Sequence, residues 1–197
     1  MAKRESLQYE HNGDKRIRIT DYGIKAEAIK YGGDSVYGSI IANDLNKEHI
    51  WKIKCVKGFQ HAACTCAVGL TDATHQSYGT YFYANDNSYA YKADGGIRNN
   101  KINIQNKTSG FKQGDELTIL YSPSSKVLSL SINDEYQEDA DIEIPDNPNG
   151  YKLAIYLYNM GDKIHLTSEL QIDNEKEMLE LRQLPQIHKY ICMNLAQ

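Results

Sequence analysis

Hydrophobic and polar residues alternate with a period of two from about residue 36 to residue 168. In the segment 51–55 (WKIKC), Trp51, Ile53 and Cys55 fall on one face and two lysines on the other, which is typical of a half-buried β-strand. The same alternation recurs in five further segments: 64–71 (CTCAVGLT), 117–121, 128–132 after a break at 122–126, 151–159 (YKLAIYLYN) and 163–166 (KIHL). Turn-forming pairs such as Asn133-Asp134 and Gly161-Asp162 follow them. Short alternating strands separated by turns predict an antiparallel sandwich or barrel.

The pattern changes near residue 170. After Asp173 and Asn174, which are plausible N-cap residues, the segment 175–184 (EKEMLELRQL) has acidic residues in its first turn and places Met178, Leu181 and Leu184 on one helical face. Pro185 should end or kink this helix. The chain is therefore divided into an N-terminal extension (1–19), a β-sandwich (20–170) and a short C-terminal helical tail (171–197).

Gly114-Asp115 precedes one of the alternating strands and raises the question of a catalytic carboxylate. A glycine permits a positive φ, and an aspartate side chain accepts hydrogen bonds from nearby backbone N–H groups. Catalysis would need a second carboxylate or a base, and the local sequence supplies none. We therefore interpret Asp115 as a corner residue and nominate no catalytic residue.

Two interpretations of Cys64 and Cys66 are compared: a metal site completed by the nearby His61, and a pair of buried core residues. On a strand, two cysteines separated by one residue point to the same face, here the face of Val68 and Leu70, where buried cysteines are common. A second ligand pair with zinc spacing is missing, and no phosphate loop or dinucleotide fingerprint is present. We expect no metal ligand and no cofactor.

Composition narrows the possible partners. The net charge is −4 and no block of basic residues is present, so a nucleic-acid surface is not predicted. No apolar run approaches the roughly 20 residues of a membrane span, and no signal-peptide pattern follows the N-terminus. With four scattered cysteines, this predicts an intracellular protein, located in the cytoplasm.

Tyrosine is unusually frequent, with 15 residues against three phenylalanines. Five of them lie in the segment 78–91 (YGTYFYANDNSYAY), among glycine, asparagine and serine. Such a mixture is typical of binding loops, and tyrosine is equally common in half-buried strands. Both readings stay open, and the tyrosines nearest the turns are the better ligand candidates.

The order of these elements resembles the SPRY (B30.2-type) domain family over residues 20–168. The elements that carry the resemblance are the WKIK strand opened by Trp51, then VGLTD (68–72), NSYAYKADGG (87–96), FKQGDELTILYSPSSKVLSLSIND (111–134) and YKLAIYLYNMGDKIHL (151–166). Tyr89 stands where the family often has tryptophan, Lys152 where proline is common, and Leu130 and Ile132 replace an aromatic. A separate PRY motif is not evident before Trp51, which indicates a divergent member.

The resemblance implies an all-β, two-sheet antiparallel sandwich of jelly-roll type without enzymatic activity. It also implies that loops at one end bind a partner protein or peptide. Carried over by position, the candidate partner-binding residues lie in three loops: Tyr31, Gly32, Gly33 and Asp34; Thr74, His75, Gln76 and Tyr78; and Tyr158, Asn159 and Met160. For the third loop, a plain hairpin turn through Gly161-Asp162 is the alternative.

Other functions stay open on sequence alone. The domain could be an architectural subunit of a larger assembly. A carbohydrate-binding, lectin-like jelly roll shares the sandwich architecture, although the single tryptophan begins a core-type strand. The segment 184–190 (LPQIHKY) weakly resembles part of a SOCS box, which would make the protein a ubiquitin-ligase substrate receptor.

Overall fold

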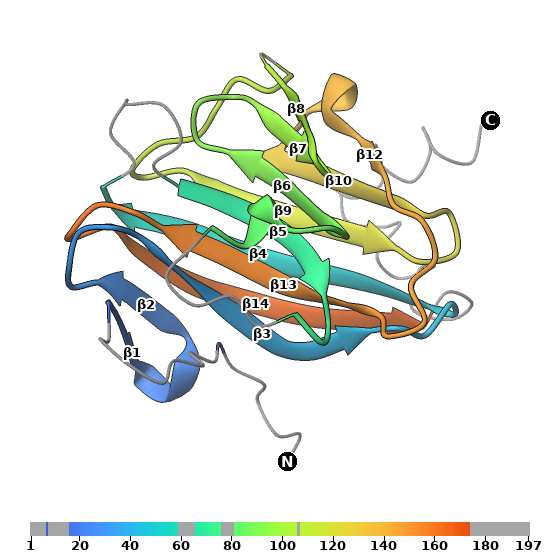
Figure 1. Ribbon diagram of the computed structural model, residues 1–197, viewed down its shortest axis with the longest axis horizontal. Coiled ribbons are helices and arrows are strands. Elements are labelled where there is room, and N and C mark those ends of the chain that lie inside the picture. Colours follow the sequence, from blue (N-terminus) through green and yellow to red (C-terminus); the bar gives the residue numbers. More distant parts are fainter. Residues whose placement is uncertain (1–6, 8–15, 59–65, 76–80, 106, 174–197) are drawn as a thin grey trace.

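The computed structural model describes residues 7, 16–58, 66–75, 81–105 and 107–173. Within these ranges the chain forms two antiparallel sheets stacked face to face (Figure 1). The larger sheet runs in the order β1 (Ile17–Thr20), β2 (Lys25–Ala28), β14 (Lys163–Asp173), β4 (Lys47–Lys57), β9 (Glu116–Ser122), β10 (Val127–Ile132) and β11 (Glu135–Tyr136), and β12 (Ile142–Glu143) pairs with β10. The smaller sheet runs β3 (Asp34–Ala42), β13 (Tyr151–Leu157), β5 (Cys66–Asp72), β6 (Ser88–Lys92), β7 (Ile97–Asn99) and β8 (Ile102–Ile104). The predicted two-sheet sandwich is confirmed.

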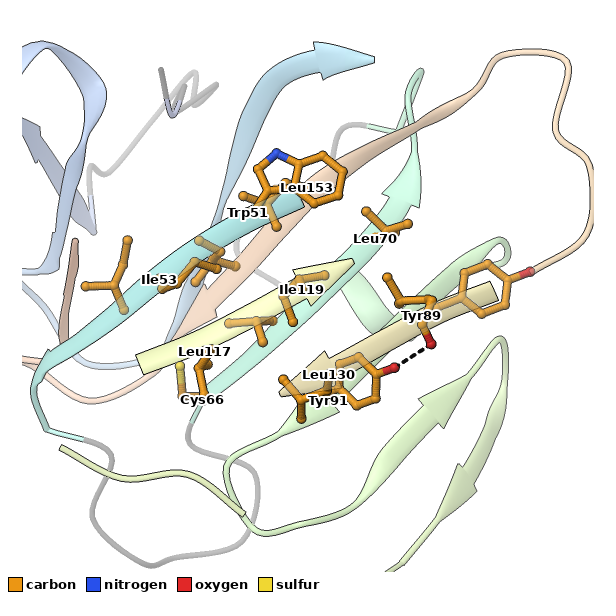
Figure 2. Close-up of a cluster of buried hydrophobic side chains, with 14 of the residues drawn as sticks. Trp51, Ile53, Cys66, Leu70, Tyr89, Tyr91, Leu117, Ile119, Leu130 and Leu153 are labelled. Atoms are coloured by element: carbon orange, nitrogen blue, oxygen red, sulfur yellow. Dashed lines mark hydrogen bonds between the residues drawn. The ribbon is translucent and has the colours of Figure 1, made fainter. Parts of the chain in front are cut away.

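The main core lies between the sheets. Trp51 and Ile53 on β4, with Leu117 and Ile119 on β9, point toward the smaller sheet, where Leu70 meets them (Figure 2). The inward faces predicted from the alternation are confirmed, because these side chains are almost completely buried. A polar bond crosses the same layer: the Tyr91 hydroxyl donates to the carbonyl of Leu128 at 2.7 Å (Figure 2).

A second hydrophobic layer covers the outer face of the smaller sheet. The 3-10 helix η2 (Phe82–Ala84) packs Phe82 and Tyr83 against outward-facing residues of the strands, and the cluster consists of Tyr37, Ala67, Phe82, Tyr83, Ala90, Ala154 and Tyr156. All seven residues of β13 are consequently buried. A strand buried on both faces lacks the alternating polar positions of a half-exposed strand.

Asp115 is a corner residue, as its place in the sequence predicted. Its carboxylate accepts hydrogen bonds from the backbone N–H of Lys112 (2.8 Å) and from the amide of Asn133 (2.9 Å). Asn133 in turn accepts a bond from the backbone N–H of Glu116 through its side-chain oxygen (2.9 Å). These bonds fix the start of β9 against the turn after β10.

The last strand is longer than the sequence pattern indicated. β14 continues to Asp173, so the predicted boundary at residue 170 falls inside it. Leu170 pairs with Ile50, and Asp173 pairs with Lys47, so β4 holds the strand in register beyond that boundary. The predicted helix with Met178, Leu181 and Leu184 lies outside the described residues.

His49 is a buried titratable group between the sheets. Its side chain is 1% exposed and stacks on Trp51, with ring centroids 5.8 Å apart, and on Tyr121 at 6.4 Å. Neither ring nitrogen has a hydrogen-bond partner among the described residues. Burial, reinforced by Lys47, lowers the pKa of His49 from 6.5 to about 4.

Lowering the pH should therefore decrease the stability of the fold, because His49 becomes protonated in the unfolded chain first. Between pH 6.5 and pH 4 the unfolded chain binds a proton that the folded chain excludes, so the free energy of unfolding falls as the pH is lowered. The loss is about 3 kcal/mol across this window. His49→Phe keeps an aromatic ring at this position and cannot be protonated. Urea unfolding of both proteins from pH 4 to pH 7 should give a shallower pH dependence for the variant, and equal slopes would contradict the assignment.

Candidate binding surface

Two of the three predicted loops meet at one end of the sandwich. Asp34 at the start of β3 pairs with Leu157 at the end of β13. The segment 29–33 therefore lies beside the turn 158–162. Ala28, which directly precedes the first segment, is bonded to this turn: its backbone N–H donates to the carbonyl of Asp162 (2.9 Å), and that of Gly161 donates to the carbonyl of Ala28 (2.8 Å).

Asp162 fixes the turn between β13 and β14. Its buried carboxylate accepts hydrogen bonds from the backbone N–H groups of Asn159 (2.8 Å) and Tyr158 (3.3 Å). Its own N–H donates to the carbonyl of Asn159 at 3.0 Å, and Gly161 takes the φ of +94° that the turn requires. The turn is thus internally bonded, and it leaves the side chains of Tyr158 and Met160 exposed.

The loop before β3 is packed on Tyr156. Gly33, with a φ of +63°, lies directly against the Tyr156 phenol, and a Cβ at this position would overlap the hydroxyl oxygen. Arg16 donates to the carbonyl of Gly32 at 2.9 Å, which ties the loop to the start of β1. Tyr31 projects from this loop and is largely exposed, whereas Asp34 is buried.

Tyrosines from the segment around η2 and from the turn after β13 contact Tyr156. Tyr81 stacks on Tyr83, with ring centroids 4.8 Å apart, and both rings meet Tyr156 edge-on at 5.9 Å and 5.8 Å. The ring centroid of Tyr158 lies 6.3 Å from that of Tyr156. We call these four residues together with Tyr31 the tyrosine surface. Edge-to-face contacts of this kind fix the rings relative to one another.

The tyrosine surface consists of exposed tyrosine rings packed on buried tyrosine rings. Tyr156 and Tyr83 are buried, while Tyr81 and Tyr158 are 46% and 41% exposed. Burial, together with Tyr158, Tyr81 and Asp34, raises the pKa of Tyr156 well above its usual value. Its hydroxyl is consequently neutral at physiological pH. The surface therefore offers aromatic area and hydroxyl groups.

The described part of the second predicted loop lies at the opposite end of the smaller sheet. Asp72, at the end of β5, pairs with Tyr151, whereas Cys66 pairs with Leu157, so the two ends are roughly 20 Å apart. Thr74 and His75 follow Asp72, while Gln76 and Tyr78 lie outside the described residues. The structure thus brings together the first and third loop groups and separates the described part of the second.

Asp72 holds this second loop. Its carboxylate accepts bonds from the N–H and hydroxyl of Thr74 (2.7 Å and 2.5 Å) and from Asn147 (2.8 Å). Burial alone would raise the pKa of Asp72, but these hydrogen bonds and one from Asn149 lower it to about 2. His75 pairs with the side-chain amide of Asn85 at 2.8 Å.

Sequence reasoning missed Tyr156. The alternation in 151–159 placed Leu153, Ile155 and Leu157 inward and left Tyr156 on the outer face, where a polar environment is the usual expectation. The cover provided by Phe82 and Tyr83 buries it instead. Tyr81 and Tyr83 belonged to the tyrosine-rich segment, so the local composition did indicate them.

Two further findings concern the part of the chain that the structure describes. Among these residues, no three or more His, Cys, Asp or Glu side chains form a group that could hold a metal ion. The same residues include no helix long and apolar enough to cross a membrane.

Comparison with known proteins gives a fold and no sequence relative. No family model matches the chain, and no curated protein matches it. Among solved structures, the SPRY domain of human HERC1 superposes with a TM-score of 0.59 at 17% identity, covering 77% of this chain and 92% of that domain. A human SPRY domain gives 0.61 at 21% identity, covering 79% and 98%. The TRIM65 PSpry domain gives 0.57 at 9%, covering 78% and 86%. The chain has the fold of an SPRY domain at low sequence identity, as the order of its motifs predicted.

Gly33 should be essential to the shape of the tyrosine surface. Gly33→Ala places a methyl group against the Tyr156 hydroxyl, in addition to the cost of a positive φ. Gly114→Ala is the matched control, because Gly114 has a φ of +95° and open space around its Cβ position. The control should lower the free energy of unfolding by about 1–2 kcal/mol, because only the strained backbone conformation contributes to the loss. Urea unfolding should show a larger loss of stability for Gly33→Ala, and its near-ultraviolet circular dichroism spectrum should change because the tyrosine rings are displaced. Equal losses of stability in the two variants would refute the packing of Gly33 on Tyr156.

Proposed function

We propose that this chain is a non-catalytic protein-interaction module that binds a partner protein or peptide through the tyrosine surface. The observation that supports it best is the pair of half-exposed rings, Tyr81 and Tyr158, which both contact the ring of the buried Tyr156. Because the rings contact one another, little side-chain entropy is left to lose when a partner binds. Tyrosine is enriched among residues that dominate binding energy.

The neighbouring residues add complementary chemistry. Asn159 presents an amide that can pair with a peptide backbone, and Met160 provides an exposed, adaptable thioether. Tyr31 extends the surface on the side of the loop before β3. Together these groups suit a peptide segment with apolar or aromatic side chains and a free backbone. The SPRY fold supports the same proposal by analogy.

The proposal also covers the cellular location of the protein and its two alternative functions. A cytoplasmic location is supported by the free thiols of Cys55 and Cys66, which lie buried in the core. The lectin-like alternative has less support, because the single tryptophan is 1% exposed and donates its indole N–H to Glu169 at 2.6 Å. It therefore offers no platform for a sugar ring. The segment 184–190, on which the ubiquitin-ligase alternative depends, lies outside the described residues.

A peptide selection tests this function. A random 12-residue peptide library displayed on phage is selected against the full chain, and the enriched peptides are titrated by fluorescence anisotropy. A double variant, Tyr81→Ala with Tyr158→Ala, should bind at least about 30-fold more weakly, since truncating a central aromatic typically costs 2 kcal/mol or more.

The control for this titration is Leu45→Ala. Leu45 is an exposed apolar residue in the turn after β3, at the opposite end of the sandwich. In the same assay, His75→Ala tests whether the second loop, at the other end of the smaller sheet, contributes to peptide binding. The control should bind as the natural protein does. Full affinity in the double variant, or equal weakening by Leu45→Ala, would refute the tyrosine surface as the binding site. The circular dichroism spectrum of each variant verifies folding.

A further inference from the structure

Strand β8 forms an open edge of the smaller sheet. It pairs with β7 on one side and, among the described residues, with no strand on the other. It lies at the edge opposite β3, four strand spacings or roughly 19 Å from β13, which carries Tyr156 (Figure 1). An open edge presents backbone N–H and C=O groups with which another strand can pair.

The backbone groups of Asn103 point to this open side. Residues in antiparallel pairs alternate between hydrogen-bonded and non-hydrogen-bonded positions. The backbone N–H of Lys92 donates to the carbonyl of Gly96 at 2.8 Å, so Ala90 and Arg98 form the next hydrogen-bonded pair between β6 and β7. Arg98 therefore faces Asn103 in a non-hydrogen-bonded pair, and the N–H and C=O of Asn103 point away from β7. In the described part of the chain, neither group has a hydrogen bond.

Arg98 provides a second, independent observation beside the same edge. Its side chain lies on the outer face of the smaller sheet, because Arg98 pairs with Ala90, a member of the second hydrophobic layer. The guanidinium Nε is buried, and Arg98 has neither a hydrogen bond through this nitrogen nor an ion pair among the described residues. Asp94, the nearest acid along the chain, pairs with Lys92 at 3.3 Å. Leaving a buried guanidinium N–H unpaired is costly, so this position suits an incoming carboxylate.

The inner face of β8 extends the apolar core to the open edge. Ile104 packs against the main core, and Ile102, on the same side of the strand, is 65% exposed. Charged side chains often protect an edge strand from pairing. Here Lys101 lies in the turn before β8 and is held by Asp86 at 2.6 Å, while β8 itself carries no charge. The edge is therefore accessible to an added strand.

We propose that β8 binds an extended segment of a partner protein, which adds as an antiparallel strand and pairs an acidic side chain with Arg98. The partner residue opposite Asn103 exchanges two backbone hydrogen bonds with it and places its side chain on the outer face. Its Cα then lies roughly 10 Å from that of Arg98, a distance that a glutamate and an arginine side chain span together. The flanking partner residues lie on the inner face beside Ile102 and Ile104, so the segment has the order apolar, acidic, apolar.

A second copy of β8 is a poorer occupant of this edge. Antiparallel pairing of two copies about Asn103 would place an asparagine, and no acid, in the position that faces Arg98. Main-chain bonds give strand addition its affinity, and alternate side chains give it specificity. This inference concerns a second surface, goes beyond the proposed function and does not depend on it.

A synthetic peptide tests the strand addition. The probe is the nine-residue peptide SVTVEVTVS, whose central glutamate is placed to face Asn103. It is titrated into the full chain, isotope-labelled in its backbone nitrogens, and the amide resonances are followed by NMR. The Asn103 amide should shift and its hydrogen exchange should slow, because its N–H becomes bonded. The same peptide methylated on the glutamate nitrogen should bind about tenfold more weakly or worse, since it cannot donate to the Asn103 carbonyl.

A double-mutant cycle tests the pairing with Arg98. A peptide with glutamine in place of the central glutamate should bind the natural protein about tenfold more weakly, as expected when a charge-assisted hydrogen bond is lost. Arg98→Gln should bind both peptides equally, and both should still shift the Asn103 amide. Lys101→Gln is the matched control, because Lys101 lies in the same hairpin and already pairs with Asp86. It should keep the preference for glutamate.

Other outcomes would overturn the proposal. An Asn103 amide that millimolar peptide does not shift, or equal binding of the glutamate and glutamine peptides to the natural protein, would each do so. Slow exchange at Asn103 without peptide would also reject it: a dependence on protein concentration would assign the edge to a second copy, and its absence to the chain's own residues. The double variant Tyr81→Ala with Tyr158→Ala should bind the probe as the natural protein does, and weaker binding would place the peptide on the tyrosine surface instead.

Discussion

Burial of β13 on both faces is the constraint on which the rest of this structure depends. One face joins the core between the two sheets through Leu153, Ile155 and Leu157. The other face lies under η2 through Ala154 and Tyr156. A strand held between two packed layers has little freedom to shift, since any slip by one residue would exchange its two faces. The residues that follow β13 therefore leave the sheet at a fixed point.

The tyrosine surface follows from that fixed point. Tyr156 is the common neighbour of Tyr81, Tyr83 and Tyr158, and the backbone of Gly33 lies against the same phenol. The exposed rings are thus packed on a buried ring. In the function proposed above, the scaffold would position this surface, and Asn159 and Met160, which are not part of the ring contacts, would supply its adaptable groups.

Aspartate carboxylates fix three of the turns in the same way. Asp115, Asp162 and Asp72 each accept at least one backbone N–H bond from a turn, and Asp115 and Asp72 also accept from asparagine amides. A short carboxylate beside a turn satisfies N–H groups that no strand partner can reach. In this fold such acids are structural, which agrees with the interpretation of Asp115 from its place after a glycine.

The sequence by itself determined the sandwich and the inward faces of its strongly alternating strands, such as β4, β9 and β10, because period-two alternation reports directly which side of a strand is buried. It determined the role of Asp115 as well, since a turn is a local feature. Tertiary structure alone decided that Tyr156 is buried, that the loop at Tyr31 meets the turn at Tyr158, and that His75 lies at the far end. It also decided that β14 continues to Asp173. These outcomes depend on which strands pair and in what register, and contacts between residues more than a hundred positions apart leave no local pattern in the chain.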